Sequence, residues 1–157
     1  MKKRVLFLII ILIFIISGCA FKQAGAENLQ SYTEGETKVE QLNIKINGQN
    51  FTAELYDNQA ASKLKTFLPL QLNMKELNGN EKYCYLDSSL TAQAQKVGKI
   101  NAGDIMLFGN DCLVVFYKSF NTSYSYTRLG RITNAAALEK AVGLGSVQMN
   151  FSLMGAE

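Results

Sequence analysis

Apolar and polar residues alternate along much of the chain from Leu42 onward, and a period of two is the pattern of half-buried strands. Leu42–Ile46 and Phe51–Tyr56 alternate on either side of Asn47-Gly48. Asn and Gly tolerate the positive φ that a type I′ turn needs, so a hairpin is predicted here. A second hairpin is predicted around Asn78-Gly79. The pattern therefore indicates a mainly β domain.

The remaining strands are predicted from similar alternation or from short apolar runs between turn residues. They are Leu70–Glu76, Lys82–Leu86, Ile105–Phe108, Leu113–Tyr117, Tyr126–Ile132 and Val147–Leu153. The stretch Asp87–Gly98 has no clear period and is predicted to be an exposed loop.

Two helices are predicted between the strands. Asp57 or Asn58 is expected to cap the first, which ends by Pro69. Thr133 or Asn134 is expected to cap the second, over Ala135–Val142. About eight strands and two helices would form a β-rich barrel or sandwich with two capping helices.

The composition excludes several classes of function. The chain of 157 residues has no histidine, which excludes Ser-His-Asp triads, Cys-His dyads and HExxH zinc sites. Three of the 16 Lys and Arg residues lie within the first four positions, so the remainder carries 13 basic and 13 acidic residues. Such a neutral body gives no electrostatic footprint for nucleic acid, and no nucleic-acid partner, metal or cofactor is predicted.

The N-terminus has the pattern of an export signal. Lys2, Lys3 and Arg4 precede the apolar run Val5–Ile16. About twelve helical residues rise roughly 18 Å, which is short of the ~30 Å hydrocarbon core of a membrane. Residues 16–19, Ile-Ser-Gly-Cys, resemble the bacterial lipobox, in which a peptidase cuts before an acylated Cys. An ordinary signal peptide or a signal anchor that contains a Cys is the alternative.

The lipobox implies a domain organisation and a location. Residues 1–18 would be a lipoprotein signal peptide, and Cys19 would carry the lipid that anchors the chain to the cell membrane on its extracytoplasmic face. Residues 19–41 would be a flexible linker, because they are polar and lack a sustained period. A docked terminal strand or helix is the alternative for this segment. The β domain would span residues 42–154.

Several segments of this domain resemble the cyclophilins. Leu42–Asp57 and the helix after it look like the family's opening hairpin and first helix, and Leu129–Ile132 resembles its F-G-K-V turn. Leu77–Tyr83 and Ala102–Leu107 look typical of a bacterial cyclophilin-like group of unassigned activity. The resemblance implies a closed eight-stranded barrel with two capping helices.

Cyclophilins are prolyl isomerases, but two of the family's catalytic residues are replaced here. The segment Leu70–Lys75 has no Arg where the family has one, and Tyr126 stands at the position of its pocket histidine. Lys75 lacks the planar guanidinium fork of Arg. The prediction is therefore a non-catalytic binding module for a peptide or small ligand. A divergent prolyl isomerase acting on exported proteins is the alternative, and a structural accessory of the cell envelope is a third reading.

A tyrosine-rich face is the predicted ligand-binding groove. Alternate residues of a strand share one face, which groups residues 124, 126 and 128, and separately residues 83 and 85. Aromatic rings with one Arg suit stacking and a charge-assisted hydrogen bond. The candidates are Tyr124, Tyr126, Arg128, Tyr83, Tyr85 and Phe116. The alternative is that these tyrosines only cover the barrel faces.

Cys84 and Cys112 are the cysteines that remain after Cys19. An even number of cysteines in an exported protein permits a disulfide. Separate thiols are the other possibility, since the two strands need not adjoin.

Overall fold

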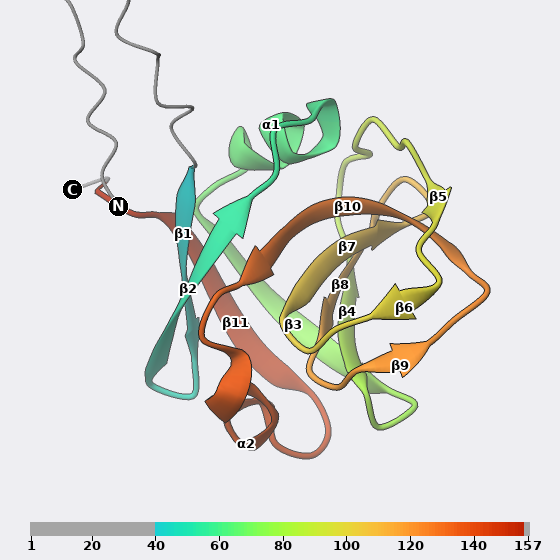
Figure 1. Cartoon of the computed structure of the whole chain (residues 1–157). Helices are drawn as coiled ribbons and strands as arrows, with labels where there is room; N and C mark the ends of the chain where they lie inside the picture. Colours follow the sequence, from blue (N-terminus) through green and yellow to red (C-terminus); the bar gives the residue numbers. More distant parts are fainter. Residues whose placement is uncertain (1–39, 156–157) are drawn as a thin grey trace, which may run out of the picture. The chain divides into compact units, whose positions relative to one another are not determined.

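The computed structural model describes residues 40–155 (Figure 1). The predicted signal peptide, the lipid site at Cys19 and nearly all of the predicted linker lie outside these residues. Within the described range, no helix is both long and apolar enough to span a bilayer.

Eight strands pair side by side and close into an antiparallel barrel. Their order around the barrel is β2-β1-β11-β3-β4-β8-β7-β10, and β10 pairs with β2 to close the ring. The strands are β1 (Gln41–Ile46), β2 (Gln49–Leu55), β3 (Leu70–Leu77), β4 (Glu81–Tyr85), β7 (Asp104–Phe108), β8 (Cys112–Phe116), β10 (Ser125–Ile132) and β11 (Val147–Leu153). The predicted closed, mainly β barrel of eight strands is confirmed.

Both predicted Asn-Gly hairpins are present. Asn47 and Gly48 have φ angles of 45° and 81°, and they join β1 to β2. Asn78 and Gly79 have φ angles of 56° and 70°, and they lie between β3 and β4. Only residues that tolerate the left-handed region fit both positions of such a turn, so the two pairs set the strand register.

The ring closes at a close backbone approach between β10 and β2. Gly130 lies opposite Leu55, and a Cβ added at Gly130 would overlap the Glu54 carbonyl oxygen. The pairing of β10 with β7 also shifts register between Arg128 and Gly130, which marks a β-bulge. A residue without a side chain is therefore needed where the barrel closes.

A helix covers each end of the barrel (Figure 1). At one end, α1 (Gln59–Lys65) is capped by Asn58, whose side chain accepts a hydrogen bond from the Ala61 N–H at 2.9 Å. At the other end lie a 3₁₀ turn, η1 (Ala135–Ala137), and α2 (Leu138–Val142). Buried residues of both helices pack into the barrel core.

The second predicted helix is wrong in its first turn and in its cap. Its first three residues form the 3₁₀ turn η1, and the Asn134 side chain makes no capping hydrogen bond. The Thr133 hydroxyl instead donates to the Thr52 carbonyl at 3.2 Å, which ties this segment to β2. Gly143 ends α2 with a φ of 56°, as its predicted position after the helix requires.

Side chains alternate between the barrel interior and its outer face. On β8, Leu113 and Val115 are buried in the interior, where the main core lies. The other residues of β8, which are Cys112, Val114 and Phe116, point outward. They form a second, smaller cluster together with Ile100, Met106 and Tyr126. The sheet therefore has apolar side chains on both faces along β7 and β8.

The two cysteines lie on neighbouring strands but on opposite faces of the sheet. Cys112 is opposite Tyr85, and Cys84 is opposite Leu113. Cys84 packs against the interior core, whereas Cys112 belongs to the outer cluster. Both thiols are free, which decides between the two possibilities that the sequence left open.

A buried lysine fastens the segment after α2 to the barrel. Lys82 of β4 has no exposed surface, and its ammonium donates hydrogen bonds to the carbonyl oxygens of Gly143 (3.0 Å) and Gly145. It also pairs with the Glu76 carboxylate of β3, which accepts a second hydrogen bond from the Tyr117 hydroxyl at 2.8 Å. Although desolvation acts to raise it, the pKa of Glu76 is lowered overall by these hydrogen bonds.

Three two-residue strands lie beside the barrel. Within the predicted loop Asp87–Gly98, β5 (Gln95–Lys96) pairs with β10. The strands β6 (Lys99–Ile100) and β9 (Phe120–Asn121) pair with each other outside the ring (Figure 1). Two residues are too few to show a period, so the sequence pattern does not reveal these strands.

Candidate functional site

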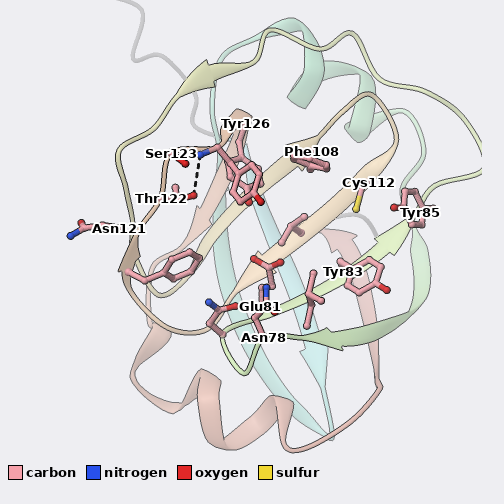
Figure 2. A pocket seen from close by; sticks show the side chains of 15 residues that line it. Asn78, Glu81, Tyr83, Tyr85, Phe108, Cys112, Asn121, Thr122, Ser123 and Tyr126 are labelled. Carbon is pink, nitrogen blue, oxygen red and sulfur yellow. Dashed lines mark hydrogen bonds between the residues drawn. The ribbon is translucent and has the colours of Figure 1, made fainter.

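A hollow of about 520 Å³ opens on the outer face of the barrel (Figure 2). Its sides are the β3–β4 hairpin and the segment after β9, and residues of β7 and β8 complete it. We call it the tyrosine hollow. It is lined by Leu77, Asn78, Asn80, Glu81, Tyr83, Tyr85, Phe108, Cys112, Val114, Phe120, Asn121, Thr122, Ser123, Tyr124 and Tyr126.

Four of the predicted site residues meet in this hollow. Tyr83 and Tyr85 project from β4, because alternate residues of a strand share a face. Their rings are 6.0 Å apart in an edge-to-face arrangement. Tyr124 and Tyr126 line the hollow from the β9–β10 side. Residues from distant parts of the sequence thus form one aromatic surface.

The tyrosines of the β10 side are held by phenylalanines. The ring of Phe108 lies 6.1 Å from that of Tyr124 and 5.6 Å from that of Tyr126. Phe116 has no exposed surface and does not line the hollow, but its ring packs edge to face on Tyr126 at 5.5 Å. Phe116 therefore supports the site from beneath.

The structure does not bring Arg128 to the tyrosine hollow. Arg128 lies on the outer face of β10, opposite Met106, and lines a separate hollow of about 450 Å³. Its guanidinium is 3.9 Å from the Asp104 carboxylate. Two residues along a strand span ~6.6 Å, so Arg128 lies beyond the edge of the hollow even though it shares a face of β10 with Tyr126.

Glu81 is the charged residue of the hollow, and the sequence analysis missed it. Its side chain is 7% exposed and lies between Tyr83 and Tyr126 (Figure 2). Glu81 is two residues before Tyr83 and four before Tyr85, so the same alternation that grouped the tyrosines places it on their face.

The surroundings of Glu81 disfavour its charged form. Desolvation raises its pKa from the ordinary value of 4.5 to about 7, and the negative charge of Glu76 adds to the rise. None of the ion pairs among residues 40–155 includes Glu81. No hydrogen bond contributes to its pKa. The carboxyl is thus nearly buried, uncompensated and open to the hollow.

Two other titratable groups of the hollow are held in their neutral forms. Burial raises the pKa of Tyr126 to about 12, and the nearby Glu81 charge acts in the same direction. Burial likewise raises the pKa of the Cys112 thiol to about 11. Neither Tyr126 nor Cys112 therefore supplies an anionic nucleophile near neutral pH.

The remaining polar groups of the hollow are neutral. Asn78, Asn80 and Asn121 contribute amides, and Thr122 and Ser123 contribute hydroxyls. The Thr122 hydroxyl accepts a hydrogen bond from the Tyr124 N–H at 3.1 Å, which shapes the turn at this edge (Figure 2). No Lys or Arg side chain is among the lining residues, and residues 40–155 contain no cluster of three His, Cys, Asp or Glu residues that could hold a metal ion.

Only one of the two positions matched to the cyclophilin catalytic residues lines the hollow. Tyr126, at the position of the pocket histidine, lines it. Lys75 is exposed on β3 opposite Tyr83, and it is not among the lining residues.

Comparison with known proteins supports the assignment of the fold. The solution structure of a hypothetical protein from Archaeoglobus fulgidus is similar, with a TM-score of 0.50 and 17% sequence identity. The match covers 75% of this chain and 98% of that protein. No curated protein matches the chain. The model of the Cyclophilin-like family matches residues 44–152, and the chain therefore belongs to the cyclophilin-like family.

Proposed function

We propose that this chain is a lipid-anchored, extracytoplasmic module that binds a peptide or small ligand in the tyrosine hollow without catalysis. The observation that carries the proposal is the hollow itself, an aromatic concavity of about 520 Å³ on the outer face of the barrel. Ligand sites typically measure about 300–1,000 Å³ and combine apolar walls with a few polar groups. Six aromatic residues, three amides and one carboxyl meet that description.

The chemistry of the hollow favours binding over isomerisation. Prolyl isomerisation by a cyclophilin depends on an arginine that donates to the prolyl amide, and no arginine lines the hollow. Lys75, the residue at the matching place in the sequence, is not among the lining residues. The neutral hydroxyls and amides suit hydrogen bonding to a ligand that is held rather than converted. A divergent prolyl isomerase remains the second candidate, because the family's fold is present.

A binding assay with variants at the rim tests the first proposal. Tyr85 and Tyr124 are 62% and 63% exposed, so their truncation to Ala removes stacking surface with little loss of packing. Both variants are expected to weaken binding of hits from a peptide and fragment screen by at least about tenfold. Tyr56, which is 37% exposed outside the hollow, supplies the control Tyr56→Ala. If Tyr85→Ala and Tyr124→Ala bind every hit as tightly as the wild type and Tyr56→Ala do, the proposed site is refuted.

An X-Pro tetrapeptide assay tests the second candidate. We expect the full-length chain to leave the isomerisation rate at background, since no guanidinium lies in the hollow. A kcat/KM of ~10⁴ M⁻¹s⁻¹ or more, the range of working enzymes, would contradict the non-catalytic assignment.

The anchor is part of the proposal and is tested separately. Cys19 supplies the thiol for acylation in the lipobox-like segment. Cys19→Ser is expected to abolish metabolic palmitate labelling and to leave unprocessed precursor. The variant Cys84→Ser is the matched control, because it removes a thiol of the barrel and leaves the segment intact. Unchanged labelling in Cys19→Ser would contradict the lipoprotein assignment.

A further inference from the structure

We infer that the ligand of the tyrosine hollow presents a protonated amine, which the Glu81 carboxylate pairs with between the tyrosine rings. This inference rests on the proposed binding function and specifies the chemical class of the ligand.

The first argument is the uncompensated carboxyl. Burying a charge is costly unless it is paired, and proteins normally provide a partner for it. Glu81 is 7% exposed, yet the ion pairs of residues 40–155 leave it out. The neighbouring cation, Lys82, is buried on the other side of the strand and is already bound to Glu76 and two carbonyl oxygens. A positively charged ligand would supply the missing partner.

The second argument is the surface around this carboxyl. The rings of Tyr83, Tyr85, Tyr124 and Tyr126, together with Phe108 and Phe120, line the same space. The negative faces of aromatic rings attract ammonium groups within ~6 Å of the ring centroid. The lining contains no Lys or Arg that would repel a cation. One carboxyl among several aromatic rings is thus complementary to an amine and poorly suited to an anion.

The protonation behaviour of Glu81 gives the inference a pH signature. Its pKa of about 7 means that both forms are populated at neutral pH, and a bound cation lowers that pKa. The other titratable or charged groups around it are Glu76, Lys82, Tyr83, Tyr85, Cys112, Tyr117, Tyr124 and Tyr126. Tyr117, Tyr126 and Cys112 have raised pKa values and stay neutral, and Glu76 has a lowered pKa and stays charged. Among the groups of this cluster with shifted pKa values, Glu81 is the one whose pKa lies near neutral pH.

Two pairs of probes separate charge from shape and a small amine from a peptide. The small pair is phenethylamine and its neutral analogue 2-phenylethanol. The peptide pair is a blocked tripeptide with a central lysine and the same tripeptide with that lysine acetylated. Binding is measured by calorimetry on the full-length chain in a neutral detergent from pH 5.5 to 8.5. The source of the amine is identified by which charged probe binds more tightly.

The expected result is a preference for the charged member of at least one pair. Its affinity should fall about tenfold per pH unit below the pKa of Glu81, where the carboxyl is protonated. Glu81→Gln should weaken binding of the charged probe by about tenfold to a hundredfold, the range of a charge-assisted hydrogen bond. The control Glu54→Gln removes the same charge outside the hollow and should leave the affinity unchanged.

Three results would overturn the inference. One is equal or tighter binding of both neutral probes, which would leave the binding function in place and reject the amine. Another is an affinity that falls as the pH rises, because protonated Glu81 would then act as a hydrogen-bond donor to a neutral ligand. The third is no binding of either amine. The carbon-13 chemical shift of the Glu81 carboxyl, followed against pH, checks that Glu81 is the group that titrates. The pKa read from this titration must be lower when the amine is bound.

Discussion

Glu81→Gln should stabilise the barrel at alkaline pH and leave it nearly unchanged at acidic pH. Moving the pKa of a carboxyl from 4.5 to about 7 corresponds to roughly 3 kcal/mol, at about 1.4 kcal/mol per pH unit. The carboxyl opens to the hollow, where solvent reduces the penalty, so roughly 2 kcal/mol is the expected gain. Gln keeps the size of the side chain and has no charge to desolvate.

The pH dependence of this gain follows from proton linkage. Between pH 4.5 and 7 the folded chain holds a proton on Glu81 that the unfolded chain has released, so the stability of the wild type falls as pH rises. Above pH 7 both states are ionised and the whole penalty is present. The lowered pKa of Glu76 acts in the opposite direction and at lower pH, and it is common to both proteins.

Urea unfolding of the wild type and of Glu81→Gln at half-unit steps from pH 4.5 to 8.5 measures the difference. We expect the free energies of unfolding to agree near pH 4.5 and to diverge steadily until about pH 7.5. A difference that is constant with pH, or a variant that is less stable at pH 8, would refute the claim that Glu81 is buried without a partner.

Three further predictions concern the barrel. Gly130→Ala should lower the free energy of unfolding by about 1–3 kcal/mol, because the added Cβ would meet the Glu54 carbonyl oxygen. Thermal unfolding that matches the wild type would contradict this close approach. Lys82→Met should cost about 3–5 kcal/mol in urea unfolding, because it leaves Glu76 without its cation, and a variant as stable as the wild type would be inconsistent with the network. Cys112 should react with iodoacetamide far more slowly than free cysteine at pH 8, because burial raises its pKa to about 11. A reaction at the rate of free cysteine would exclude a buried thiol.

Local patterns in the sequence predicted the barrel well. Asn47-Gly48 and Asn78-Gly79 fix two hairpins because few other residues adopt the required φ angles. Asn58 was one of two predicted caps, and its side chain forms the bond that such a cap makes. The failure at Ala135–Ala137 has a physical cause: three alanines have no side chains that distinguish a 3₁₀ turn from an α-helix, and Thr133 bonds to β2 instead of capping.

The candidate site was only partly predictable. Alternation placed Tyr83 and Tyr85 on one face of a strand, but it could not show that the segment before β10 returns to the same place. Alternation also does not show where a hollow ends along β10, so the pattern groups Arg128 with Tyr126 although Arg128 lines a separate hollow. The burial of Glu81 is not visible in the sequence, because glutamates are mostly exposed, although alternation places Glu81 on the same face of β4 as Tyr83.

The two sides of the tyrosine hollow differ in how firmly they are held. The β3–β4 side belongs to the ladder of the barrel, whereas the backbone of the segment from Phe120 to Tyr124 is held by the two-residue pairing of β9 with β6 and by the hydrogen bond from the Thr122 N–H to the Gly98 carbonyl. Backbone amides in this segment should therefore exchange with deuterium much faster than those of β8. A ligand that bridges the hollow would slow exchange on this side and change little on the other. Differences in ligand width would accordingly be taken up by the β9 segment, while the hairpin that carries Glu81 keeps its position.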